Sequence, residues 1–192
     1  QRPLAESELQ KMVAVVYPYL RQELSVPGNA EEQTRHWLSA LTELGLLRAQ
    51  TTDNTTSYQP AAQSKADVMS AASSNSASHR LRALSQVILQ TLERHYIVVA
   101  TLAAAGQGAL TRSELEARCH AHAQRMSRLQ GLNAPEFFDM KLIRGIVTLL
   151  FNRGVLFANA DERLNFNETI HLVTQAAELV ISSDFRQGLL RS

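Results

Sequence analysis

The strongest constraint on the fold is a long run of helical spacing between Leu81 and Ala105. Apolar side chains recur there every three or four residues, which places them on one face of a helix. Its members include Leu84, Val87, Ile88, Leu92, Tyr96, Val99 and Leu102. Hydrophobic residues make up 45% of the 192 residues and charged residues 19%, which is typical of globular proteins rather than disordered ones. The sequence therefore predicts a mainly helical, globular fold.

The first sixty residues predict two helices. Ser7 is expected to cap the first helix, and Pro18 should kink or shorten it. The second helix is expected from about Ala30 to Leu44, with Gly45 as the residue that ends it. Its inward-facing side chains are predicted to be Trp37, Leu38, Leu41 and Leu44. Residues 46–49 then predict a short strand, 51–57 a polar turn, and 58–60 the end of the unit.

Residues 61–79 differ in composition from their surroundings. They are rich in Ala and Ser and nearly lack bulky side chains, so they cannot bury much apolar surface. We interpret them as a linker or mobile loop. The predicted domains are accordingly residues 1–60, a helical unit with a possible wing, and residues 80–192.

The second domain predicts three helices and a hairpin after the long helix. Thr111 or Ser113 should cap a helix that reaches about Gln130, with Leu115, Cys119, Met126 and Leu129 as its apolar stripe. A further helix is expected at about 136–152, with Asn133 or Ala134 near its cap, Pro135 in its first turn, and Glu136 and Asp139 favouring its N-terminus. A β-hairpin is predicted near 155–166 and a last helix from about Glu168 to Leu190.

Short stretches of the first half recur in the second half. Ser7-Glu8-Leu9 resembles Ser113-Glu114-Leu115, and Leu44-Gly45-Leu46-Leu47 resembles Arg153-Gly154-Val155-Leu156. Each half predicts helix, turn, helix, Gly, short strand, polar loop and strand, which is the order of a winged-helix unit. The predicted fold class is therefore mainly α with one or two short β-hairpins, with two winged-helix-like units as one arrangement of them.

Cysteine and histidine residues cluster in the run Cys119-His120-Ala121-His122. On a helix only Cys119 and His122 share a face, and no second ligand pair has zinc spacing. We therefore expect no metal and no cofactor, and interpret Cys119 as a small core residue. A single cysteine also suits a reducing compartment.

A row of basic residues lies beside the apolar stripe of the same helix. Arg118, His122 and Arg125 are spaced at i, i+4 and i+7, and Arg128 is close to them. This row is the candidate interaction surface, suited to acidic phospholipid headgroups or an acidic carrier protein. The alternative is a solvated edge whose arginine stems cover the core.

Composition and motifs exclude several functions. A net charge of +1 argues against binding nucleic acid over the whole surface, so nucleic acid is not an expected partner. A winged-helix-like module that binds nucleic acid or protein is the alternative hypothesis. Neither Gly-x-Ser-x-Gly nor a phosphate-binding glycine loop is present.

The longest apolar stretch, 96–105, is about half of what spans a bilayer, so membrane contact is expected to be peripheral. The start at Gln1, without a Met, indicates an interior point of a longer chain.

Four stretches between Val87 and Leu156 are specific enough to identify a family. They are Val87 to Tyr96, Ser113 to Glu116 with Cys119-His120, the run Gln124 to Asp139, and Gly154-Val155-Leu156. In these stretches the chain resembles the C-terminal region of the bacterial membrane-bound glycerol-3-phosphate 1-O-acyltransferases. Weaker similarity extends over nearly the whole chain apart from the Ala/Ser-rich segment.

The resemblance implies a parent enzyme that transfers a fatty acyl group to the sn-1 hydroxyl of glycerol 3-phosphate in phospholipid synthesis. Its implied partners are acyl carrier protein or acyl-coenzyme A, the catalytic domain of the same chain, and the cytoplasmic face of the bacterial inner membrane. The family's catalytic pair is His-x-x-x-x-Asp, in which the His is the general base. None of the six histidines here has an Asp five positions later. We therefore expect a noncatalytic C-terminal domain, without catalytic residues, that supports the catalytic domain, membrane docking or assembly.

Overall fold

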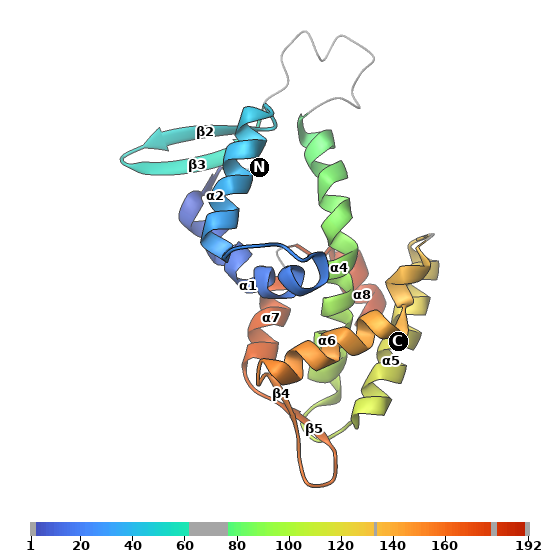
Figure 1. The fold of residues 1–192 in the computed structure, drawn as a ribbon. Coiled ribbons are helices and arrows are strands. Elements are labelled where there is room, and N and C mark those ends of the chain that lie inside the picture. The colour runs from blue at the N-terminus through green and yellow to red at the C-terminus, as the bar shows by residue number, and fades with distance from the viewer. Residues whose placement is uncertain (1–2, 62–76, 133, 178–179, 191–192) are drawn as a thin grey trace. The chain divides into compact units, whose positions relative to one another are not determined.

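The computed structural model describes residues 3–61, 77–132, 134–177 and 180–190 (Figure 1). The fold is mainly helical with short antiparallel hairpins, which confirms the predicted fold class. The chain forms two compact units, Gln1–Ile88 and Leu89–Ser192. Of the predicted linker, residues 62–76 lie outside the described residues, and residues 77–79 already belong to a helix. The predicted domain boundaries stay a prediction.

The first unit combines two helices with a three-stranded antiparallel sheet of order β1-β3-β2. Its elements are β1 (Leu4–Ala5), α1 (Glu6–Leu24), α2 (Ala30–Glu43), β2 (Leu47–Thr52) and β3 (Thr55–Pro60). Tyr17 and Leu20 of α1 and Leu38 of α2 are buried. Tyr17 also donates a hydrogen bond of 2.6 Å to the carbonyl of Pro27, which ties the connection between the helices to the core. The helix predicted from about Ala30 to Leu44 is confirmed as α2, which ends one residue earlier, at Glu43.

Local details of the first unit differ from the predictions. Ser7 is not the cap, because α1 begins at Glu6 and Ala5 is its N-cap residue. Pro18 does not shorten α1, since the helix continues to Leu24, and the kink that was its alternative stays a prediction. Leu44, predicted to face inward, is exposed because it is the C-cap residue, and Leu46 returns after Gly45 to fill the core in its place.

The first hairpin is longer than predicted. Thr51, Thr52 and Thr55 to Ser57 belong to strands instead of a turn, and they pair in register from Leu47–Pro60 to Thr52–Thr55. β-Branched threonines favour extended backbone. The turn is confined to Asp53 and Asn54, whose φ angles of 49° and 61° are those of the tight turn that suits a two-residue hairpin.

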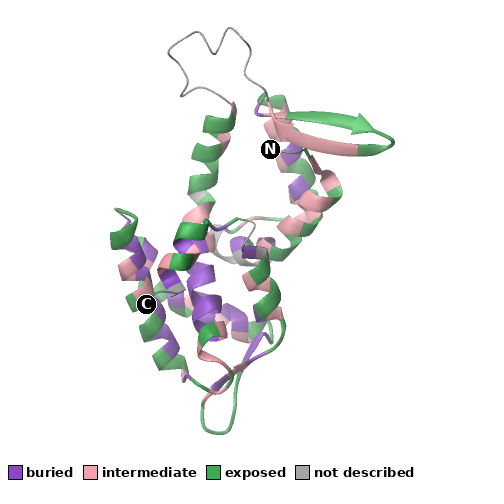
Figure 2. Cartoon of the chain, turned by 180° about the vertical axis from the view of Figure 1, so that it is seen from behind, coloured by how far each residue is buried: buried purple, intermediate pink, exposed green. Residues whose placement is uncertain are grey.

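The second unit packs helices around the second half of α4. Its elements are α4 (Ala77–Ala105, which begins in the first unit), α5 (Arg112–Leu129), the 3-10 helix η2 (Pro135–Phe138), α6 (Met140–Asn152), β4 (Leu156–Ala158), β5 (Leu164–Phe166), α7 (Thr169–Ala177) and α8 (Ser183–Leu190). Figure 2 shows that α4 changes from exposed in its first half to buried in its second half. The fully buried side chains include Ile97, Leu102, Leu115, Phe137, Ile143, Leu150, Leu164 and Phe185. The predicted hairpin is confirmed as the antiparallel pair β4–β5.

Two predicted helices of this unit are each interrupted. The helix expected at 136–152 is η2 followed by α6, because Asp139 caps α6 by accepting a hydrogen bond of 2.7 Å from the Lys141 N–H. The helix expected at 168–190 is α7 followed by α8, where the Ser182 hydroxyl oxygen accepts from the Phe185 N–H. Leu129 was predicted to join the apolar stripe, but it is exposed at the last residue of α5. Asn133 lies outside the described residues.

The structure extends the internal similarity seen in the sequence. The Ala5 N–H donates to the Glu8 carboxylate at 3.0 Å, and the Thr111 N–H donates to the Glu114 carboxylate in the same way at 2.7 Å. Both cap residues also pair with the hairpin that follows. Ala5 pairs with Ser57 of β3, and Thr111 pairs with Arg163, the residue just before β5. Each unit therefore contains, in the same order, a short extended segment, helices and a hairpin, and the assignment as winged-helix-like units stays a prediction.

Candidate functional site

The predicted interaction surface lies on α5, which Thr111 starts with a capping box. Arg118 and His122 are one turn apart on this helix and line the same pocket. Arg125 donates to the backbone carbonyl of Gly188 in α8 at 3.3 Å, and Arg128 donates to the carbonyl of Gln124 at 3.3 Å. The structure thus brings two of the four predicted residues to one pocket.

The pocket lies between α4, α5 and α8 and has a volume of about 190 Å³. Its lining residues are Ala100, Thr101, Ala104, Ala105, Arg118, His122 and Leu189. The four α4 residues that line it, Ala100, Thr101, Ala104 and Ala105, have small side chains and lie within two turns of the helix, which leaves room between the helices. A second pocket of about 310 Å³ shares Ala100 and Ala104 with the first and is completed by Tyr96, Ala103, Thr174, Ser183, Arg186 and Gln187.

The electrostatics of the first pocket are dominated by cations. Burial lowers the pKa of His122, and the neighbouring positive charges of Arg125 and Arg118 lower it further. His122 is therefore neutral at pH 7. Among the described residues Arg118 makes no ion pair. Glu114, the acidic residue one turn earlier on α5, pairs with Arg163 instead, at 3.1 Å. None of the described residues that line the pocket is acidic.

The Cys119-His120-Ala121-His122 run separates into different environments. Cys119 is fully buried, as its interpretation as a small core residue predicted, and burial raises the pKa of its thiol to about 12. The Nδ1 of His120 lies 2.7 Å from the carbonyl of Phe138, which fixes this ring against η2. In the described part of the chain no three His, Cys, Asp or Glu side chains are close enough together to hold a metal ion.

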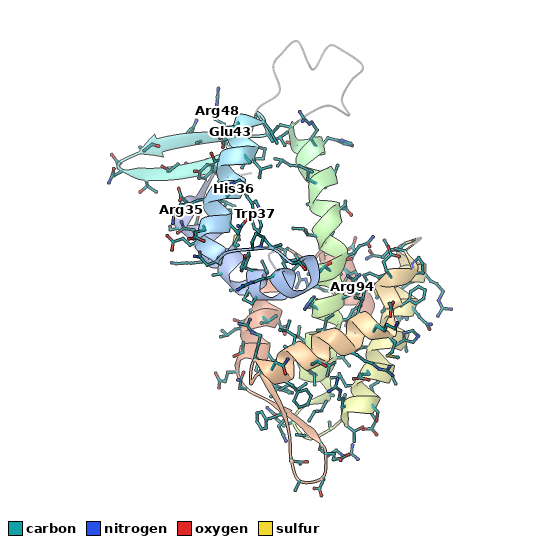
Figure 3. The ribbon with its side chains drawn as sticks, in the orientation of Figure 1. Arg35, His36, Trp37, Glu43, Arg48 and Arg94 are labelled. Carbon is teal, nitrogen blue, oxygen red and sulfur yellow. The ribbon has the colours of Figure 1, made fainter. Side chains whose placement is uncertain are left out.

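The sequence reasoning missed a buried polar cluster in α4. Thr91, Glu93, Arg94 and His95 are all buried. Arg94, labelled in Figure 3, donates to the Thr91 hydroxyl at 3.2 Å, and Nδ1 of His95 lies 2.9 Å from the Thr91 carbonyl. Burial raises the pKa of Glu93 to about 7, and the charge of Arg94 opposes that rise. The signal was present, because Glu93-Arg94-His95 lies between the apolar positions Leu92 and Tyr96 of the long helix.

Charges on the second helix of each unit bear on the winged-helix alternative. α2 exposes Arg35 and His36, labelled in Figure 3, but also Glu31, Glu32 and Glu43. On α6 the exposed cations are Lys141 and Arg144, and Arg144 pairs with Glu116 at 3.1 Å. Neither helix presents the contiguous basic face that phosphate binding requires. Of the described helices, none combines the length and apolar character needed to cross a membrane.

Comparison with known proteins gives one consistent family. The family model described as the glycerol-3-phosphate acyltransferase C-terminal region matches residues 1–159. A glycerol-3-phosphate acyltransferase of Pseudomonas paraeruginosa is 36% identical over 190 residues, which cover 97% of this chain and 21% of that protein. One of Pseudomonas putida is 37% identical over 185 residues, covering 94% of this chain and again 21% of the relative. The chain thus spans about a fifth of the length of these relatives. No solved structure matches it.

Proposed function

Because the chain belongs to the glycerol-3-phosphate acyltransferase family, as its C-terminal region, we propose that it is a noncatalytic domain supporting the catalytic domain of such an enzyme. The proposed parent transfers a fatty acyl group from acyl carrier protein or coenzyme A to the sn-1 hydroxyl of glycerol 3-phosphate. The observation that carries the proposal is the match to the C-terminal region over nearly the whole chain.

The side chains support a noncatalytic role. Acyl transfer needs a base or nucleophile that can reach the substrate. Cys119 is buried with its pKa raised to about 12, so its thiol is neither accessible nor ionised at pH 7. No histidine has the Asp five positions later that the family's catalytic pair requires. The chemistry of the parent is therefore assigned to residues outside this chain.

The first half of α4 supports a role in docking. Leu84 and Ile88 are exposed apolar side chains there, and the exposed Arg80 and Arg82 lie close to them in the sequence. Apolar and basic side chains together suit an anionic membrane surface or an acidic protein surface. We place the domain, with its parent, at the cytoplasmic face of the bacterial inner membrane. The acyl carrier protein or acyl-coenzyme A would be met through the catalytic domain.

The purified chain tests the proposal. Mixed with glycerol 3-phosphate and palmitoyl-coenzyme A, it should form no acylated product, and it should bind the separately expressed catalytic part of the parent in calorimetry. The replacement of Leu84 and Ile88 by Ser should weaken that binding or the binding to anionic vesicles, whereas Leu172→Ser, at an exposed leucine of α7, is the matched control. Acyl transfer by the chain alone would contradict the noncatalytic assignment.

A further inference from the structure

We propose that the pocket between α4, α5 and α8 binds the phosphate group of a small organic phosphate, with Arg118 and His122 as its polar partners. The proposal does not depend on the acyltransferase assignment, because it rests on the shape and charge of the second unit. Three observations support it. The pocket has free volume, Arg118 at its wall has no ion-pair partner among the described residues, and His122 in the same wall is neutral.

The space comes from small side chains. Ala100, Ala104 and Ala105 line the pocket, whereas the larger Leu102, in the same turns of α4, is buried and does not line it. A volume of about 190 Å³ corresponds to roughly six water molecules at their liquid volume, enough for a phosphate and a few carbon atoms. The alanines and Leu189 give the ligand's carbon atoms an apolar wall.

The charge of the pocket favours an anion. Arg118 has no ion-pair partner among the described residues, and Arg125 adds a second positive charge close enough to lower the pKa of His122. The charge of Arg118 helps to lower the pKa of Glu114, but the Glu114 carboxylate is already bound by Thr111 and Arg163. A planar guanidinium beside a partly enclosed, apolar wall is well suited to phosphate oxygens.

His122 would complete the site as a second hydrogen-bond donor. The two arginines now disfavour its protonated form. A bound phosphate would cancel part of that positive field and would favour the imidazolium, which donates from both ring nitrogens. Ligand binding should therefore be accompanied by proton uptake at His122. The pKa of His122 can then be used to measure whether the pocket is occupied.

Histidine NMR of the whole 192-residue chain provides the test. The His122 signals are assigned by their loss in His122→Asn, and the pKa is followed at constant ionic strength in sodium chloride, inorganic phosphate, glycerol 3-phosphate or vesicles of phosphatidylglycerol. We expect glycerol 3-phosphate to raise the pKa of His122 by about one unit, as an opposite charge at contact distance does. A similar rise with inorganic phosphate would show that the phosphate group alone is recognised.

Two variants separate charge from space. Arg118→Gln should itself raise the pKa of His122 in chloride, and it should abolish the rise caused by glycerol 3-phosphate. Ala104→Leu should reduce the ligand-induced rise by filling the pocket without a change of charge. Arg128→Gln is the control, because Arg128 is on the same helix but does not line the pocket, and it should keep the full rise.

Three results would overturn the proposal. One is an unchanged His122 pKa with both phosphate ligands, in a chain whose circular dichroism shows it is folded. Another is an equal rise in the wild type and Arg118→Gln, which would place the anion elsewhere. The third is a rise with phosphatidylglycerol vesicles only, which would make the basic residues part of a membrane surface and not a pocket for a soluble phosphate.

Discussion

Glu116 shows how a single carboxylate organises a helix pair. Its side chain is only 11% exposed and accepts from Arg112 at 2.8 Å on α5 and from Arg144 at 3.1 Å on α6. A buried acceptor of two charged hydrogen bonds is costly to remove, although exposure of the arginines reduces the effect. The contact with Arg144 joins α5 to α6, so Glu116 stabilises tertiary structure as well as its own helix.

We expect Glu116→Gln to lower the free energy of unfolding by about 1–2 kcal/mol, because the amide keeps the shape but loses the charge. The matched control is Glu31→Gln, which removes the exposed pair with Arg35, where the side chains are 66% and 58% exposed. The control should change stability by less than about 0.5 kcal/mol. Urea unfolding measures both, and equal effects would contradict the assigned role of Glu116.

Glu93 gives the molecule a pH dependence with a definite sign. Burial raises its pKa from 4.5 in the unfolded chain to about 7. The folded state then binds more protons than the unfolded state between these values, so stability should fall as the pH rises from about 4.5 to about 7 and level off above that. Glu93→Gln should remove this dependence and be more stable than the wild type at pH 8, by about 2 kcal/mol. Urea unfolding at pH 5 and pH 8 checks it, and an unchanged pH dependence in the variant would count against a buried, titrating Glu93.

At the scale of elements, helix ends are set by single glycines. Gly154 ends α6 with a φ of 65°, and the Val155 N–H returns to the Leu150 carbonyl at 3.0 Å. Gly45 ends α2 with the equivalent bond from Leu46 to Leu41. Both arrangements turn a buried residue back onto the core, which is why the hairpins start where they do.

Gly154→Ala should therefore destabilise the chain by about 1 kcal/mol, through backbone strain alone, since a Cβ there would meet no atom within 4 Å. Gly145 lies inside the same helix, with equally free space and an ordinary helical φ. Gly145→Ala should instead stabilise by about 0.5–1 kcal/mol. Thermal unfolding of the two variants compares them directly, and shifts in the same direction would refute the argument.

Helical periodicity predicted most elements, and the errors have local causes. Glu168 to Leu190 carries a nearly continuous helical pattern, but the Ser182-Ser183-Asp184 sequence starts a new helix, and its capping signal was overlooked. The polar composition around Asp53-Asn54 predicts a turn, but the β-branched threonines there favour strands. In both places local side-chain preferences, a capping serine and β-branched threonines, decided the boundary instead of hydrophobic spacing.

At the scale of the whole chain, the sequence predicted the family and fold class but not the pocket. The spacing of Arg118 and His122 placed them on one face of α5, which the structure bears out. The other wall comes from Ala100 and Ala104, which the sequence presents as ordinary helix formers. Only the packing of α4 against α5 and α8 shows that these small residues leave a space beside the cations. Long-range packing of this kind has no signature in a single sequence.

We propose that this C-terminal domain supports an active site located elsewhere in the parent enzyme. The most direct measurement is acyl transfer to glycerol 3-phosphate by the parent enzyme lacking the residues that match 1–192, with and without the separate chain added. We expect the truncated enzyme to be folded and membrane-bound but inactive, and the added chain to restore activity. Full activity of the truncated enzyme would contradict the claim that catalysis depends on this domain.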